Sequence, residues 1–158
     1  MIPFDLSTLD LERDAHTDKL LELLSTVPDG YHTARADVWV GGKKEPGWHL
    51  EADGYYIGVQ PDYKCGWDEE GDGKVLTALL TRQAETKGQV NLTTTAGFRD
   101  LGNGEHEFYV KWRAGVHLGS TTGLGDDSPR AGRPGLGWAN DPGMALLLAY
   151  LRAWGVAK

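Results

Sequence analysis

The residues whose types and spacing come nearest to a site for chemistry form an acidic run over positions 68–73. Its oxygen-bearing side chains and final glycine match the first positions of a calcium-binding loop. The twelfth position of such a loop needs a bidentate carboxylate, and Leu79 occupies it here. We therefore interpret the run as an acidic surface turn that leads to a helix N-cap at Asp72, and we expect no metal site.

The histidines and the single cysteine give no catalytic pattern. The histidines are dispersed and match neither H-x-H nor H-E-x-x-H; they are His16, His32, His49, His106 and His117. Lys64 would lower the pKa of the Cys65 thiol, but a nucleophile also needs a positioned base, and none is adjacent. His106 and Glu107 would point to opposite faces of a strand. We therefore favour a protein that is not an enzyme and needs no cofactor. The alternative is a hydrolase whose His and Asp side chains converge only in the fold.

Tryptophan and acids combine in one predicted partner-binding site. Trp67 directly precedes the acidic run, and a large aromatic anchor within a charged rim is typical of protein-binding patches. The alternative is a tryptophan packed inside the domain. The predicted site comprises Trp67, Asp68, Glu69, Glu70 and Asp72.

A second candidate site lies in the glycine-rich stretch 119–140, which we expect to be a long loop. Ser128 stands where a dinucleotide-binding loop needs its third glycine, and the chain has no G-x-x-x-x-G-K-[ST] segment. Hydroxyls, guanidinium groups and a stacking ring would nevertheless suit an anionic nucleotide. The residues of this alternative site are Thr121, Thr122, Arg130, Arg133 and Trp138.

Composition narrows the class of protein. A length of 158 residues fits a single domain, residues 1–158, with a sizeable core. The net charge of −7 argues against a simple phosphate-backbone binder, so we expect no direct nucleic-acid binding. Only one cysteine is present, which rules out an internal disulfide. With no secretory signal pattern and no apolar run long enough for a membrane span, we expect a cytoplasmic protein that does not enter a membrane.

Hydrophobic periodicity predicts a helix near each end of the chain. Apolar residues recur at helical spacing from Ser7 to Val27, and Pro28 follows. The stretch 141–154 has an N-cap at Asp141, a proline in the first turn and Gly155 at its end. Apolar side chains cover most of its girth, so this helix must be buried, across a sheet. Residues 74–87 fit a helix or a strand.

Alternating patterns predict strands at 31–40, 54–60, 89–96 and 107–113. The first two are expected to pair with each other across a turn-rich connection at 41–47. Asn103-Gly104 is a strong turn signal that should pair the last two.

The C-terminal third resembles small phage-encoded α+β proteins of the phage ABA sandwich type. The resemblance rests on the aromatic strand at 108–113, a polar loop, and the closing helix with Ala145, Ala149 and Ala153 at four-residue spacing. It implies a helix, antiparallel sheet and helix layout, and no established activity. The longer middle section, residues 54–104, departs from that pattern.

These observations predict an α+β fold with an antiparallel sheet of four or more strands and two or three helices, including the buried C-terminal helix. We expect a phage-type, non-enzymatic binding protein that inhibits a host defence complex by stoichiometric association, as anti-CRISPR-like proteins do. Its acidic blocks would compete for basic surfaces of a host protein or nucleoprotein complex. The alternative is a binder or sponge of an anionic nucleotide signal.

Overall fold

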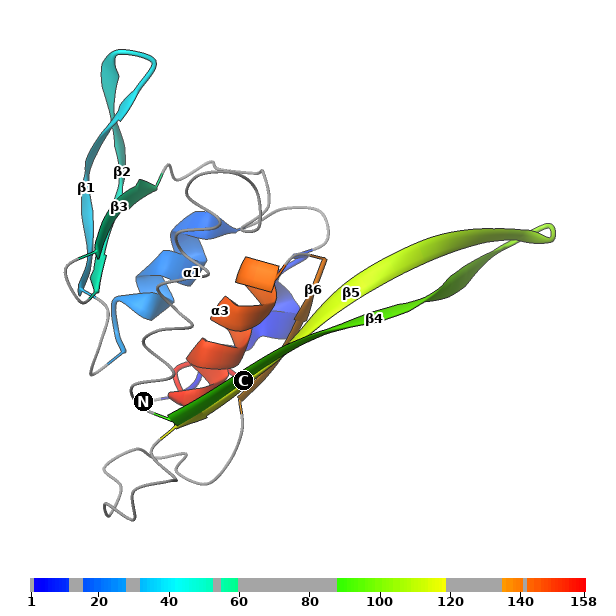
Figure 1. Ribbon diagram of the computed structural model, residues 1–158. Coiled ribbons are helices and arrows are strands. Elements are labelled where there is room, and N and C mark those ends of the chain that lie inside the picture. The colour runs from blue at the N-terminus through cyan, green and yellow to red at the C-terminus, as the bar shows by residue number, and fades with distance from the viewer. Residues whose placement is uncertain are drawn as a thin grey trace.

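The computed structural model describes residues 2–11, 16–27, 32–52, 55–59, 88–118, 135–140 and 142–158. Their six strands form two antiparallel three-stranded sheets, in the orders β1-β2-β3 and β4-β5-β6, and two α-helices accompany them (Figure 1). An α+β architecture is therefore confirmed. The predicted single sheet of four or more strands differs from this arrangement, in which the described strands are divided equally between two sheets.

Helix α3 (Pro142–Ala153) is the centre of the core, as its apolar girth predicted. All of its residues from Gly143 to Leu151 are buried, and it packs across β6 (Gly135–Ala139) and β5 (Glu105–Leu118). The approach is close because β6 has glycines where the helix crosses it: a Cβ at Gly137 would overlap the carbonyl oxygen of Ala145. Gly155 ends the helix with a φ of 75°, the left-handed conformation that glycine adopts without steric cost.

The N-terminal helix is shorter than its apolar spacing predicted. The segment Leu6–Thr8 is a 3-10 turn, with the Asp5 carboxylate accepting from the Ser7 backbone N–H at 3.0 Å. Helix α1 is confined to Thr17–Leu24, and His16 precedes it with a φ of 49°. A left-handed residue interrupts a right-handed helix, so α1 cannot extend backwards through His16. Helix α1 still buries Leu20, Leu21 and Leu24 in the core.

In the first sheet, one strand was missed from sequence. Strand β1 (His32–Val40) is as predicted, but β2 (Lys43–Ala52) follows after only two turn residues, Gly41 and Gly42. It occupies much of the predicted connection 41–47 because Pro46 and Gly47, which normally interrupt strands, are accommodated within it. Strand β3 (Tyr55–Val59) therefore pairs with β2 and not with β1, which corrects the expected pairing.

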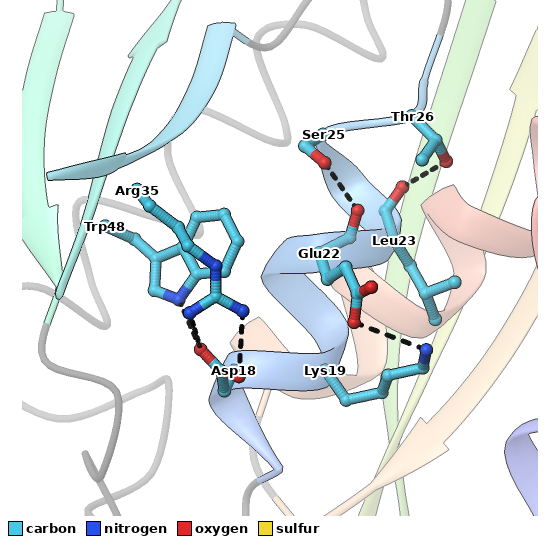
Figure 2. Close-up of polar contacts among 8 residues, drawn as sticks. All are labelled: Asp18, Lys19, Glu22, Leu23, Ser25, Thr26, Arg35 and Trp48. Carbon is cyan, nitrogen blue, oxygen red and sulfur yellow. Dashed lines mark hydrogen bonds and ion pairs between the residues drawn. The ribbon is translucent and has the colours of Figure 1, made fainter.

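A polar contact fixes the first sheet to helix α1 (Figure 2). The Trp48 indole Nε1 and the Arg35 guanidinium both donate to the Asp18 carboxylate, at 2.9 Å and 3.1–3.2 Å. The guanidinium also lies over the Trp48 ring, 4.5 Å from its centroid. The hydrogen bond from Trp48, followed by that from Arg35, holds the pKa of Asp18 below its ordinary value. Trp48 is at the same time buried in the core, together with Leu50 of the same strand.

In the second sheet, the strands are longer than predicted. Strand β4 (Gly88–Gly102) and β5 pair along their whole length, with one bulge between Asp100 and Gly102. Asn103 and Gly104 connect them with φ values of 54° and 74°, as a two-residue type I′ turn requires. This confirms the predicted turn. Strand β6 corrects the expectation of a continuous loop over 119–140.

The two chain ends are held together beside α3. Phe4 forms a parallel bridge with Ala157, and backbone hydrogen bonds of 2.8–3.2 Å join residues 4 and 6 to residues 156 and 158. Among the helices that the structure describes, none is long and apolar enough to cross a membrane.

Candidate functional site

The second sheet extends well beyond the helices as a two-stranded projection (Figure 1). Strand β6 pairs with β5 only between Val116 and Trp112, so residues 95–111 have just the β4–β5 pairing. We call these residues the arm. An isolated hairpin of this kind is marginally stable in water and gains stability when it packs against another surface. The exposed side chains of the arm therefore indicate what kind of surface it could contact.

The two faces of the β4–β5 hairpin differ in chemistry. Directly paired residues share a face, and successive pairs alternate between faces. One face, which we call the apolar face, carries in outward order the pairs Val90–Val116, Leu92–Ala114, Thr94–Trp112, Ala96–Val110, Phe98–Phe108 and Asp100–His106. The other, which we call the polar face, carries Gln89–His117, Asn91–Gly115, Thr93–Arg113, Thr95–Lys111, Gly97–Tyr109 and Arg99–Glu107.

Near the molecular body, the apolar face belongs to the core. Ala114 and Val116 are fully buried, and Val90, Leu92 and Trp112 pack against the same cluster. Helix α3 covers this region, and the burial of apolar surface between them stabilises the fold.

Along the arm, the same apolar face is open. Phe98 and Phe108 are 73% and 61% exposed and pack edge to face, with ring centroids 5.6 Å apart. Val110 on the same face is also exposed, as is Leu101 at the bulge between Asp100 and Gly102. Phe98 and His106 line a shallow hollow of about 280 Å³ near the tip. Single exposed apolar residues are normal, but a contiguous group on a projecting element is typical of an interaction site.

The strand edges of the arm add a second means of recognition. Beyond Trp112, β5 has β4 on one side and no other described strand on the other. The outer edge of β4 also has no described strand beside it, because β4 is an edge strand of the sheet β4-β5-β6. Such edges offer backbone N–H and C=O groups to a strand of another protein.

The other projecting hairpin, β1–β2, has less to offer. Trp39 near its tip is 70% exposed, but its cross-strand neighbour is Lys44, whose Nζ lies 5.5 Å from the ring centroid. The surrounding tip residues from 41 to 46 are exposed glycines, charged residues and one proline. One ring under an ammonium group is not an apolar patch, so the arm is the better candidate site.

The sites predicted from sequence fall almost entirely outside the residues that the structure describes. All five residues of the predicted partner site, Trp67 to Asp72, fall outside the described residues, as do Thr121, Thr122, Arg130 and Arg133. Of the anionic-ligand site only Trp138 is described: it lies on β6, 48% exposed, with the Arg113 guanidinium 5.9 Å from its ring centroid. Within the described ranges, no group of three or more His, Cys, Asp or Glu residues is arranged to hold a metal ion.

Sequence reasoning noted the aromatic strand at 108–113 and the turn, but missed the arm. The turn signal alone would not have revealed it, because a regular two-residue hairpin about Asn103-Gly104 places Phe98 opposite Tyr109. The bulge between Asp100 and Gly102 shifts the register by one residue, so that Phe98 faces Phe108. Comparisons with protein-family models, curated proteins and solved structures find no match for this chain.

Proposed function

We propose that the protein is a binding protein that recognises a protein partner through the apolar face of its arm. The observation that carries the proposal is the pair Phe98–Phe108, exposed on a hairpin whose inner part is buried under α3. Aromatic side chains supply large contact areas at little cost in conformational entropy, and they are enriched among the residues that dominate binding energy.

Charge points to a partner that binds mainly by apolar contact. Residues 88–118 contain three cationic and three anionic side chains: Arg99, Lys111 and Arg113 against Asp100, Glu105 and Glu107. The hairpin is therefore formally neutral, although the chain as a whole has a net charge of −7. A neutral hairpin gives little long-range attraction to a strongly basic or acidic surface.

The available area indicates the shape of the partner. A fully exposed phenylalanine presents about 200 Å² of surface, and leucine and valine present less. Scaled by their exposed fractions, the apolar side chains of the arm together offer roughly 400 Å². A stable interface buries about 800 Å² on each partner. Two arms packed face to face would therefore form only a weak dimer. A groove that also takes the tip and a free strand edge would reach the required area, and we assign that shape to the partner.

The narrower prediction, stoichiometric inhibition of a host defence complex by a phage-type protein, is compatible with this mode of binding. A hairpin that occupies a groove blocks whatever the groove normally accepts. The acidic run at 68–72 would then be a second contact to basic surfaces of the same complex.

The proposal is tested by placing a photo-crosslinking phenylalanine analogue at Phe108 and irradiating the protein in host lysate. The same analogue at Trp39 is the matched control, because that ring is at least as exposed (70% against 61%) but lies on the other hairpin. We expect a discrete adduct from position 108 that is absent from position 39. The adduct should disappear when unlabelled wild-type protein competes and persist when F98S/F108S competes.

Equal labelling from both positions, or equal competition by the double variant, would contradict arm-mediated recognition. Sedimentation of the purified protein provides a second test. A tight dimer that dissociates in F98S/F108S would mean that a second copy, and not a different protein, covers the apolar face.

A further inference from the structure

The polar face of the second sheet has a different chemistry from the apolar face. From Tyr109 inward it carries Lys111 and Arg113 and no carboxylate on the paired residues of the three strands. The β4 side chains on the same face carry hydroxyl or amide groups and are all exposed: Gln89, Asn91, Thr93 and Thr95. The acids of this face, Glu107 and Glu105, lie at the far end near the turn. A cationic region has therefore formed on an acidic protein.

An aromatic ring and a guanidinium lie together at the inner end of this region. Arg113 and Trp138 are direct cross-strand partners, and the guanidinium lies 5.9 Å from the ring centroid. Strand β6 is fixed behind them, because Arg152 of α3 donates from Nη1 to the Leu136 carbonyl oxygen at 2.7 Å. The half-exposed ring of Trp138 is therefore held on a strand that is anchored to helix α3.

A second pair of the same kind lies further out. A Cβ at Gly97 would be 2.9 Å from the Tyr109 hydroxyl oxygen and 3.0–3.2 Å from two atoms of its ring, so the Tyr109 side chain lies across the strand at the residue that has no side chain. The Arg99 guanidinium is 5.7 Å from the centroid of this ring. The glycine thus lets an aromatic surface lie along the sheet beside a cation.

The spacing of the two pairs selects the kind of ligand. Tyr109 and Arg113 are four residues apart on β5, which corresponds to roughly 13 Å at about 3.4 Å per residue. Lys111 lies on the same face between them. One planar ring of a small ligand cannot reach both ends, whereas an extended chain with repeated rings and repeated anionic groups can.

We propose that the polar face of β4, β5 and β6 binds single-stranded nucleic acid. Bases stack on Trp138 and Tyr109, and backbone phosphates contact Lys111 and Arg113, as on open sheets that combine aromatic rings with cations. A duplex is excluded as the main ligand because its bases are already stacked on one another. This goes beyond the proposed function, which uses the opposite face and the arm tip. It also revises the expectation from net charge, since the distribution of charge over a face decides phosphate contact.

Fluorescence anisotropy with a labelled single-stranded oligonucleotide of about 12 nucleotides tests the assignment. We expect saturable binding that weakens as salt rises. Trp138→Ala should weaken binding by at least about fivefold through the loss of one stacked base. Arg113→Gln should lower the slope of log K against log salt by about 0.7, the value for one phosphate contact on a single strand.

Lys44→Gln is the matched control, because it also removes one cation that lies beside a tryptophan, but on the β1–β2 hairpin. Its affinity should stay within about twofold of wild type, well inside the effect of one stacked base. Circular dichroism melts of each variant establish that the fold is retained. Wild-type affinity in both Trp138→Ala and Arg113→Gln would overturn the assignment, and so would equally tight binding of poly-glutamate.

The outcome is separable from that of the proposed function. Trp138→Ala leaves Phe98 and Phe108 unchanged, so it should keep the crosslink from position 108 while losing oligonucleotide affinity. Conversely, F98S/F108S should retain oligonucleotide binding, because neither residue lies on the polar face.

Discussion

The inner and outer parts of the β4–β5 apolar face have the same alternating pattern but different surroundings. Inside, Val116, Ala114 and Leu92 face α3 and join the core. Outside, Val110, Phe108 and Phe98 continue the same face into solvent. The comparison teaches that one strand pattern joins the core where a helix covers it and leaves an exposed apolar surface where none does, and we propose that this surface serves recognition.

The largest expected effect is at β6, which pairs with the inner part of β5 under α3. Gly137→Val places a Cβ against the backbone of α3, where no flexible side chain can move aside. We expect a loss of about 3 kcal/mol in the free energy of unfolding, at the upper end for overpacking. Urea denaturation followed by far-UV circular dichroism measures it. A loss below about 1 kcal/mol would mean that α3 is not seated tightly on β6.

The matching change on the outer part should cost far less. F98S/F108S removes two large rings, but these rings are exposed and lose mainly their edge-to-face contact. We expect about 1 kcal/mol or less in the same urea experiment. A loss as large as that of Gly137→Val would show that the arm is part of the core, and the distinction between the two parts would fail.

A change at the turn sharpens the comparison by acting on the arm alone. Gly104→Ala introduces a Cβ at a φ of 74°, which costs roughly 1 kcal/mol at that residue. Because hairpin ends open locally, we expect faster amide exchange in residues 95–111 and little change in residues 112–118. Hydrogen exchange read by mass spectrometry separates the two segments. Uniform acceleration along both strands would contradict their independence.

The smallest effect concerns the anchor of the first sheet (Figure 2). The folded-state pKa of Asp18 is lowered by hydrogen bonds from Trp48 and Arg35, so its stabilisation is complete above the unfolded pKa and is lost as pH falls through the folded pKa. Between about pH 6 and pH 3 the melting temperature of wild type should therefore fall more than that of Asp18→Asn. Asp37→Asn, a change at an exposed acid of β1, is the control and should track wild type.

Local signals predicted much of the fold. Helix α3 was identified from the apolar side chains all around residues 141–154, and β1 from the alternation in 31–40. The β4–β5 hairpin was identified from the Asn103-Gly104 turn. Strand β2 was missed because Pro46 and Gly47 oppose strand formation locally, while pairing with β1 outweighs them. Helix α1 was predicted to be too long, because apolar spacing does not reveal that His16 takes a left-handed backbone conformation.

The candidate site was harder to predict because exposure is a property of the whole fold. Nothing in the Phe98 and Phe108 positions distinguishes a buried strand from a projecting one; the difference arises because β6 ends opposite Trp112 and α3 does not reach further. Sequence reasoning instead favoured Trp67 and the acids beside it, which lie outside the described residues. The cationic region was hidden for a related reason, since net charge averages over faces that β-strand alternation separates.

The measurement that tests the central claim most directly is the dissociation constant between wild-type protein and the purified partner crosslinked from position 108, compared with that of F98S/F108S. Two central aromatic contacts should contribute more than about 1.4 kcal/mol together, so the double variant should bind at least tenfold more weakly. Equal affinity of both proteins for that partner would contradict recognition through the arm.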